Sequence, residues 1–570
     1  MGREGWGPCP DLLSLQRLVP PPWPGAILPP MASDLSFPPD APEPELPDSI
    51  FDEEEVPELI SAPLAAEPWT HRAVGFLVLI TLLAGFLRLY KLGEWSLWID
   101  EAHTLRDAVL MPLDQFFATS RSRYPIGFLL LRFLEPLLPS SGEGSQRLVF
   151  AFFGIVSVPL LGIVVRSLLG IGPALIASAI LCISPWHIYW SQNCRAYSLV
   201  LFFSLCAIGL FHLGVEQGRK RHFFASLFFG GLAGLTHPSA FLLVPGLLVY
   251  LACLKWRCLP KPPCLSGKAM LSFVLPVGIS FVIGVVIAFD AFGDFFRAKE
   301  GESFFHLLNT TLHFVRIPGI VAAFGGAYLV WKRQIRGGVL LAALVLVPFL
   351  ELAFASFFVK ATAQYLFFTL PAWAALGGYG AWEITRFLNV RGAGRIFIRF
   401  LPLAMILLDL GAQSHLYFHY RYGDRPRWRE AADYIETHSL ETDRIVSTNQ
   451  PSMEWYLNPS EPQIGITSAG WSQGYRRVDL LASWTVTDLK KWKAEAEKKG
   501  TRIFVALTSP VLLEADPKKV WDTWIRSHFH QIRRLPNWVG PKDMTILIYR
   551  YDPPKKKAGR GLGSGNERKG

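Results

Sequence analysis

The sequence predicts a mainly α-helical, polytopic membrane protein that carries a small α/β domain near its C-terminal end. Of its 570 residues, 51% are hydrophobic and only 18% are charged, whereas soluble domains are about 25% charged. Apolar runs close to the roughly 20 residues that cross a bilayer recur along the chain, and the composition becomes mixed only after Phe418. No basic stripe with interleaved aromatic residues accompanies the net charge of +10, so we expect no nucleic-acid partner.

Residues 1–70 are expected to form a disordered cytoplasmic tail. Clustered prolines and the acidic run from Asp52 to Glu55 leave this segment without a core or a useful helix. The prolines also interrupt the apolar stretch that a signal peptide requires. Met31 could be the true start of the chain, which would not change the functional argument.

We predict eleven membrane spans within a transmembrane domain of residues 71–420. The expected spans are Ala73–Tyr90, Leu148–Leu168, Pro173–Trp190, Tyr197–Val215, Phe223–Leu235, Ala240–Leu254, Ala269–Phe289, Leu312–Trp331, Val339–Val359, Tyr365–Glu383 and Ile396–Phe418. The fifth and sixth are short and meet at His237-Pro238, so they could also be one broken pair.

Basic residues orient these spans, because short cytoplasmic loops are enriched in Lys and Arg. Alternate connections are rich in them: Gly218–His222, Lys255–Lys261, Lys332–Arg336, and a last group formed by Arg386, Arg391, Arg395 and Arg399. This alternation predicts a cytoplasmic N-terminus. It places the first loop, Gly93–Arg147, and everything after Phe418 on the outer side.

Two outer segments contain more than linkers. The first outer loop carries an apolar stripe from Phe128 to Leu134 that is too short to span, which predicts helices lying in the membrane interface. After the last span, "WREAADYIETH" and "VTDLKKWKAEAEKKG" have helical patterns, while "DRIVSTN", "TRIFVALT" and "MTILIYRY" have strand patterns. Alternating helices and strands predict an extracytoplasmic α/β domain at 421–552, followed by a disordered basic tail at 553–570.

Four groups of polar residues fall near the predicted outer face. They are Asp100 with Glu101; His187, Gln192, Asn193 and Arg195; His237 before Pro238; and Lys360 with Gln364 and Tyr365. Taken singly, these groups have ordinary explanations: a helix cap for the acidic pair, an interfacial anchor for the arginine, a structural histidine, and a snorkelling lysine.

Together the four groups suit glycosyl transfer from a lipid-linked phosphate sugar. An acceptor hydroxyl must lose a proton as it attacks the anomeric carbon, which requires a base such as a carboxylate. The leaving group is a lipid phosphate, whose growing negative charge requires Arg, Lys or a metal ion. A carboxylate on one side and cations on the others would supply both functions.

Several motifs also occur in an order seen in a known family. They are "LGEWSLWIDEAHTL", "RYPIGFLLLRFLEPLL", "SQRLVFAFFGIVSVPLLGIVVRSLLG", "SPWHIYWSQNCRAYSLVLFFSL", "TAQYLFFTLPAWAALGG" and "WREAADYIETH". Over roughly residues 73–450 the chain resembles bacterial membrane glycosyltransferases of the dolichyl-phosphate-mannose protein mannosyltransferase superfamily, which includes aminoarabinose transferases. The ordered set is far more specific than any single motif.

The resemblance implies a C-type glycosyltransferase fold in a bacterial inner membrane, a polyprenyl-phosphate sugar donor, and inversion at the anomeric carbon. The acceptor would be a protein, lipid or glycan. Asp100, with Glu101 beside it, matches the catalytic base, and Arg195 matches the arginine of a Ser-Gln-x-x-Arg motif, with a role either in contacting donor phosphate or in ordering the site. No cofactor is certain, and a divalent metal ion remains open, since relatives differ in metal dependence.

Further site residues are assigned as hypotheses. Lys360, Arg121 and Arg123 are candidate cations for the donor phosphate, and the candidate substrate-binding residues are His237, Gln192, Asn193 and Tyr365.

The chain departs from the family at two positions. It has Asn193 where relatives usually carry an acidic residue, and Gln364 where they usually carry arginine. These departures are the best support for the alternative of a non-catalytic transporter or assembly scaffold that retains the fold. A transporter should also show repeated halves and charged residues buried in mid-span. The sequence has few such charges and no clear repeat.

Overall fold

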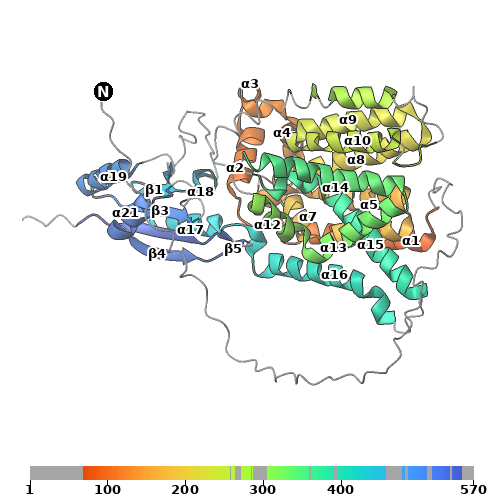
Figure 1. The fold of residues 1–570 in the computed structure, drawn as a ribbon. Helices are drawn as coiled ribbons and strands as arrows, with labels where there is room; N and C mark the ends of the chain where they lie inside the picture. The colour runs from red at the N-terminus through yellow and green to blue at the C-terminus, as the bar shows by residue number, and fades with distance from the viewer. Residues whose placement is uncertain are drawn as a thin grey trace, which may run out of the picture. The chain divides into compact units, whose positions relative to one another are not determined.

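The structure is a computed structural model that describes residues 68–554, apart from short gaps and longer ones at 263–270, 287–303, 391–395 and 458–477. The tails expected at 1–70 and 553–570 lie almost entirely outside the described residues, as does part of the predicted span Ala269–Phe289. Most of the described chain is helical, and its long apolar helices are those of an integral, multi-pass membrane protein (Figure 1).

Five described segments are long and apolar enough to cross a membrane as single units. They are α1 (His71–Leu89), α5 (Glu143–Leu169), α8 (Tyr197–Gln217), the pair η4 (Pro238–Leu242) with α10 (Leu243–Lys255), and α14 (Arg336–Ala355). Other helices of the same region are α9 (Lys220–Thr236), η5 (Ala363–Thr369), α15 (Leu370–Val390) and α16 (Ile396–His419).

Two predicted spans are bent rather than straight. The span expected at Pro173–Trp190 consists of α6 (Ile171–Ile183) and α7 (Pro185–Ser191), which meet at 61°. The span expected at Leu312–Trp331 is divided between α12 (Phe304–Val315) and α13 (Ile317–Lys332), which meet at 94°. Proline explains both breaks, because a Pro at the start of the second helix has no N–H to continue the first. Arg316 completes the second break with a positive φ of 71°.

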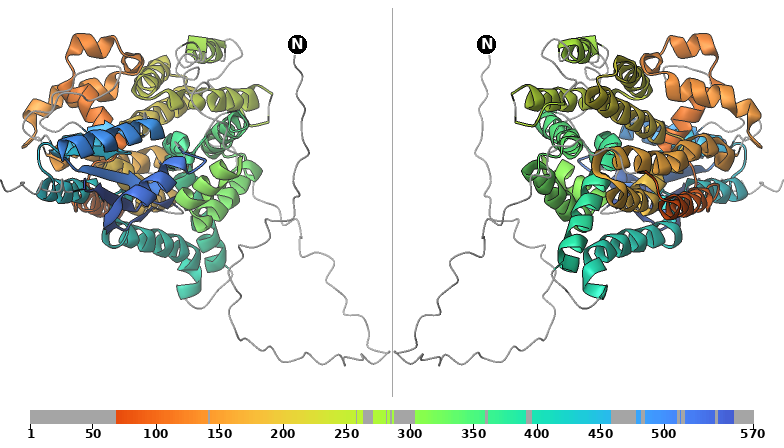
Figure 2. Two further views of the ribbon diagram at one scale, coloured as in Figure 1. Left: turned by 90° about the vertical axis from the view of Figure 1, so that its left-hand side faces the viewer. Right: turned by 90° about the vertical axis from the view of Figure 1, so that its right-hand side faces the viewer.

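Glycines allow α13 and α15 to approach closely. A Cβ added at Gly326 would lie 2.1 Å from the carbonyl oxygen of Leu376, and one at Gly380 would lie 2.3 Å from that of Ala322. Small residues of this kind let membrane helices pack backbone to backbone. By contrast, the teal helix α16 lies at the margin of the helical bundle in both views of Figure 2 and exposes apolar side chains such as Leu408.

The first outer loop folds into short helices, as its apolar stripe predicts. They are α2 (Ile99–Leu105), the π-helical turn η1 (Arg106–Leu110), α3 (Leu113–Phe117), η2 (Ser120–Arg123), α4 (Ile126–Leu134) and η3 (Glu135–Leu137). A separate apolar cluster that includes Leu97, Leu105, Phe116 and Leu131 holds them together. This cluster fixes α2, which carries Asp100.

The C-terminal region contains the expected α/β structure. Its elements are η6 (Tyr422–Asp424), α17 (Trp428–His438), β1 (Arg444–Ser447), α18 (Gln450–Leu457), β2 (Val478–Leu480), α19 (Val486–Lys499), β3 (Ile503–Thr508), α21 (Val520–His528), β4 (His530–Leu535), β5 (Trp538–Val539), β6 (Lys542–Asp543) and β7 (Ile546–Tyr551). The main sheet has the order β2-β1-β3-β7-β4, in which β2, β1 and β3 are parallel and β7 runs antiparallel to β3 and β4. The sequence patterns predicted β1, β3, β7, α17 and α19 and missed the rest.

Alternating side chains give this sheet two apolar faces. Phe504 and Ala506 of β3 join the cluster that contains α17 and α18. Val505 and Leu507, the intervening residues, join the cluster that contains α19 and α21. Because successive residues of a strand point to opposite faces, helices cover both sides of the sheet.

Candidate active site

Helix α2 divides its side chains between two environments. Glu101, Ala102 and Leu105 are buried, whereas Asp100 and His103 are only partly buried. A spacing of three or four residues places side chains on the same face of a helix, so Asp100, His103 and Thr104 share one face. The predicted catalytic residues Asp100 and Glu101 therefore point in different directions.

No described residue forms a hydrogen bond or a close ion pair with the carboxylate of Asp100, although Arg195 and Arg121 lie near enough to interact with it electrostatically. Its backbone carbonyl accepts a hydrogen bond from the Thr104 hydroxyl at 2.9 Å. That hydroxyl in turn accepts one from Nη1 of Arg195 at 3.1 Å. Thr104 thus connects the two residues that the sequence predicts as catalytic base and phosphate ligand.

Arg195 lies in the short connection between α7 and α8 and faces Asp100. Burial disfavours its charge, but Asp100 and nearby phenols, among them Tyr197 and Tyr124, raise the pKa of Arg195 above its ordinary value. The guanidinium is therefore held as a cation at the face of α2 that carries the free carboxylate. An anion that binds beside it would meet a positive charge that cannot be lost.

Aromatic side chains from separate segments surround the neighbouring His237. The ring centroid of His237 lies 4.9 Å from Tyr197, 6.3 Å from Tyr365 and 6.5 Å from Tyr124. Tyr365 belongs to η5 and Tyr124 follows η2, so the arrangement gathers the first outer loop, the break before η4 and the start of η5. The structure thus places His237 and Tyr365 near Arg195.

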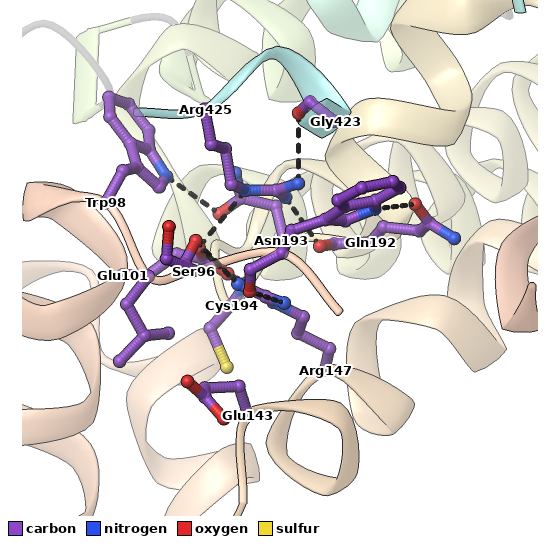
Figure 3. A network of polar contacts seen from close by, with 12 residues as sticks. Ser96, Trp98, Glu101, Glu143, Arg147, Gln192, Asn193, Cys194, Gly423 and Arg425 are labelled. Carbon is purple, nitrogen blue, oxygen red and sulfur yellow. Dashed lines mark hydrogen bonds and ion pairs between the residues drawn. The ribbon is translucent and has the colours of Figure 1, made fainter. Parts of the chain in front are cut away.

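Glu101 occupies a different place, inside a fully buried network (Figure 3). Its Oε1 accepts hydrogen bonds from Nε of Arg147 and from the backbone N–H of Cys194, both at 2.8 Å, and its Oε2 accepts one from Nη2 of Arg147 at 2.9 Å. Nε of Arg425 lies 3.3 Å from the same Oε2. Burial alone would raise the pKa of Glu101, but Arg147 and Arg425 lower it below its ordinary value. These contacts favour a structural task for Glu101 over one on substrate.

Gln192 is also engaged by protein groups. Its Nε2 donates to the last carbonyls of α1 and the residue after it, including those of Arg88 at 3.1 Å and Tyr90 at 2.7 Å. Its Oε1 accepts from Trp95 at 3.2 Å and from Tyr417 at 2.9 Å. The predicted substrate-binding Gln192 therefore ties the end of α1 to α16.

Asn193 is buried beside Trp98. Its Oδ1 accepts from the indole N–H of Trp98 at 3.4 Å, while its Nδ2 has no hydrogen-bond partner among the residues that the structure describes. Its neighbour Cys194 contributes the N–H that binds Glu101. The segment from Gln192 to Arg195 thus joins the buried network to the partly buried face of α2 that carries Asp100.

The three predicted auxiliary cations differ in position. Arg121 forms an ion pair with the buried carboxylate of Asp107, and burial together with the neighbouring Arg106 and Arg195 lowers the pKa of Arg121 to about 10. Arg123 is exposed. Lys360 lies outside the described residues.

Sequence reasoning did not single out several residues of this region. Arg147 and Arg425 complete the environment of Glu101, and the hydroxyl of Tyr456 accepts a hydrogen bond from the N–H of Leu97 at 2.6 Å, just before α2. Arg147 stands in the quoted motif "SQRLVF", which is the one signal that could have marked it. Within the described ranges, no three His, Cys, Asp or Glu side chains gather closely enough to hold a metal ion.

Comparison with known proteins shows what the chain resembles. Its fold is shared with solved structures of ArnT and of the oligosaccharyltransferase AglB. Residues 122–279 match the family model described as dolichyl-phosphate-mannose-protein mannosyltransferase.

Two solved structures show the shared fold. The apo structure of ArnT from Cupriavidus metallidurans has a TM-score of 0.51 at 14% identity, and the match covers 84% of this chain and 98% of ArnT. The archaeal oligosaccharyltransferase AglB from Archaeoglobus fulgidus, in complex with an inhibitory peptide and a dolichol-phosphate, has a TM-score of 0.51 at 12% identity, over 78% of this chain and 70% of AglB. No curated protein matches the sequence.

Proposed function

We propose that this protein transfers a sugar from a polyprenyl-phosphate donor to an acceptor hydroxyl on the outer face of the membrane, with Asp100 as general base. The observation that carries the proposal is the free carboxylate of Asp100 on the same face of α2 that Arg195 approaches through Thr104. The dolichol-phosphate in the AglB complex and the name of the matching family support a polyprenyl-phosphate donor.

The reaction requires one proton acceptor and one anion site. The acceptor oxygen attacks the anomeric carbon and forms the new glycosidic bond, while its proton moves to Asp100. The bond between the anomeric carbon and the phosphate oxygen breaks, and the lipid phosphate leaves with that electron pair. Attack opposite the leaving group inverts the anomeric carbon, as the family resemblance implies.

Arg195 stabilises the negative charge that develops on the departing phosphate. Preorganised cations at the position where charge develops lower the barrier without reorganisation. Arg195 is charged and positioned by Thr104. Arg121, whose pKa is lowered by burial and by Arg195, lies nearby but is paired with Asp107, and Lys360 stays a proposed further cation. A divalent metal ion at this site likewise stays open.

The acceptor is a protein, lipid or glycan with a free hydroxyl. The partly buried rings of His237 and Tyr365 next to Arg195 offer surfaces on which a sugar can pack. A bilayer delivers the lipid laterally. We place the reaction on the outer face because the basic loops put Asp100 there.

Turnover in nanodiscs tests this function. The purified full-length protein should release sugar from at least one member of a panel of labelled polyprenyl-phosphate hexoses and pentoses in the presence of an acceptor. Asp100→Asn should lower the rate about 10²–10⁴-fold with an unchanged melting temperature, because its carboxylate makes no hydrogen bond to described residues. Asp114→Asn, an exposed acidic residue of the same loop, is the matched control. Lipid binding without turnover in the wild-type protein would favour the non-catalytic alternative instead.

A further inference from the structure

His103 is a histidine of the α2 face that the proposed mechanism leaves without a task. It lies three residues after Asp100, so their side chains are neighbours on one face, with Cβ atoms about 5–6 Å apart. Its own side chain is only partly buried. This position places an imidazole beside the free carboxylate and within the field of Arg195.

Burial and three nearby arginines keep this imidazole neutral. Burial is the largest effect, and Arg106, Arg121 and Arg195 add to it, so the pKa of His103 falls to about 3. Arg121 also donates to the backbone carbonyl of His103 at 3.5 Å. A neutral imidazole offers one hydrogen-bond donor and one acceptor, whereas a charged one offers two donors.

One ring nitrogen of His103 lacks a partner. Its Nδ1 is buried from solvent and forms no hydrogen bond with any described residue. A buried polar atom without a partner destabilises the folded state, and such atoms are exceptions that require an explanation in folded proteins. A bound group that hydrogen-bonds Nδ1 would remove this cost.

The chemistry of the face points to a sugar hydroxyl. In the proposed reaction the anomeric carbon lies between the acceptor oxygen at Asp100 and the phosphate at Arg195, so the sugar ring is held against the segment of α2 between them. His103 is the side chain of that segment with both a donor and an acceptor. A hydroxyl also donates and accepts, while a phosphate is served better by the arginines.

We infer that His103 binds a hydroxyl group of the donor sugar and thereby contributes to the choice of sugar. The inference rests on the proposed function and deepens it, because it names a residue that binds the sugar part of the donor rather than its lipid phosphate. Loss of the imidazole should weaken binding of sugar-bearing lipids and leave binding of the bare lipid phosphate intact.

Two lipid classes separate this role from the alternatives. Binding of undecaprenyl phosphate and of undecaprenyl-phosphate mannose, glucose and aminoarabinose would be measured with the full-length protein in nanodiscs. We expect His103→Ala to weaken the preferred sugar lipid about fivefold to tenfold, as for one lost hydrogen bond, and to change the affinity for undecaprenyl phosphate less than twofold. His103→Gln, which keeps a donor and an acceptor, should recover part of the loss.

His222 supplies the matched control, because it is also partly buried with an unpartnered Nδ1 but stands at the start of α9, away from Asp100. His222→Ala should bind all four lipids as the wild-type protein does. Equal weakening of both lipid classes in His103→Ala, or no change in either, would overturn the inference. A wild-type protein that binds undecaprenyl phosphate but none of the sugar lipids would overturn the proposed donor itself, and the inference with it.

Discussion

Arg147 and Glu101 form a bidentate, fully buried ion pair, with Nε to Oε1 at 2.8 Å and Nη2 to Oε2 at 2.9 Å. Arg147 belongs to α5 and Glu101 to α2, so the pair fastens the helix of Asp100 to a long span. Carbonyls of Leu92, Trp95 and Ser96 accept the remaining hydrogen bonds of the guanidinium. The acidic neighbour of Asp100 therefore acts on the geometry of α2.

Removing Glu101 should destabilise the fold. Glu101→Ala leaves two buried guanidinium groups without their carboxylate, and breaking a buried pair in this way costs about 3–5 kcal/mol. We expect a lower melting temperature in detergent. Glu101→Gln, which keeps an acceptor for Cys194, should lose less.

Glu94→Ala is the control for this variant. Glu94 pairs with Lys91 at 3.2 Å but its side chain is 57% exposed, so its loss should leave the melting temperature unchanged. A Glu101→Ala protein that melts like the wild type would show that the pair does not fasten α2.

Arg195 and Thr104 should affect the rate to different degrees. Arg195→Ala removes the cation of the phosphate site and should lower kcat/KM about 10²–10³-fold. Thr104→Val removes only the hydroxyl that positions Arg195, and we expect a loss of about tenfold or less. Steady-state kinetics with the active donor measure both effects.

Thr104→Ser separates positioning from packing, because it keeps the hydroxyl and loses a methyl group. Its kcat/KM should stay near the wild-type value. A loss in the Ser variant with none in the Val variant would argue that the methyl group, and not the hydrogen bond at 3.1 Å, is the important part of Thr104.

Asp424 should make the stability of the protein depend on pH. Burial raises the pKa of Asp424 from 3.8 to about 6, although Arg421 and Arg425 oppose the shift. A raised pKa means that the folded state binds more protons than the unfolded state between these values. The contribution of Asp424 to stability is therefore fully present below about pH 4 and is lost as the pH rises through about 6; it amounts to about 3 kcal/mol.

Asp424→Asn should remove this contribution. The variant imitates the neutral side chain, and Asn tolerates the positive φ of 53° at this position. We expect its melting temperature at pH 7, relative to the wild type, to be higher than at pH 4. A difference that stays constant between the two pH values would contradict the raised pKa.

Arg316 and Asp409 should stabilise the bend between α12 and α13. Two hydrogen bonds, at 3.0 and 2.9 Å, join the Arg316 guanidinium to the Asp409 carboxylate on α16. Arg316→Met or Asp409→Leu alone should cost about 1–3 kcal/mol. The double variant should cost less than the sum of the two, because neither charge is left alone. Additive losses in thermal melting would show that the two residues act independently.

Proline illustrates how far the sequence predicts the helices. Apolar runs located most of them, but the bends before α7 and α13 were not predicted. Pro185 and Pro318 stand at these bends, yet Pro159, Pro348 and Pro402 lie inside continuous helices. Neighbouring helices decide whether a proline breaks a membrane helix, and a hydropathy pattern does not record neighbours.

In the site, too, the sequence predicted some features and missed those that depend on distant segments of the chain. The sequence motifs predicted that Asp100 and Arg195 act together, and the structure brings them to one face through Thr104. The sequence did not predict that Gln192 donates hydrogen bonds to the end of α1, or that Glu101 contacts Arg425. Such partners lie far apart in the chain. Long-range polar pairs leave no periodicity in the sequence.

The distance along the chain between Glu101 and Arg425 has a consequence for biosynthesis. Glu101 emerges early, with the first outer loop, whereas Arg425 follows the last helix of the bundle, α16. Until that late segment has been synthesised, the carboxylate beside Asp100 lacks one of its two cations. A nascent chain therefore completes the buried contacts that hold α2 only after α16 and the segment behind it have been made.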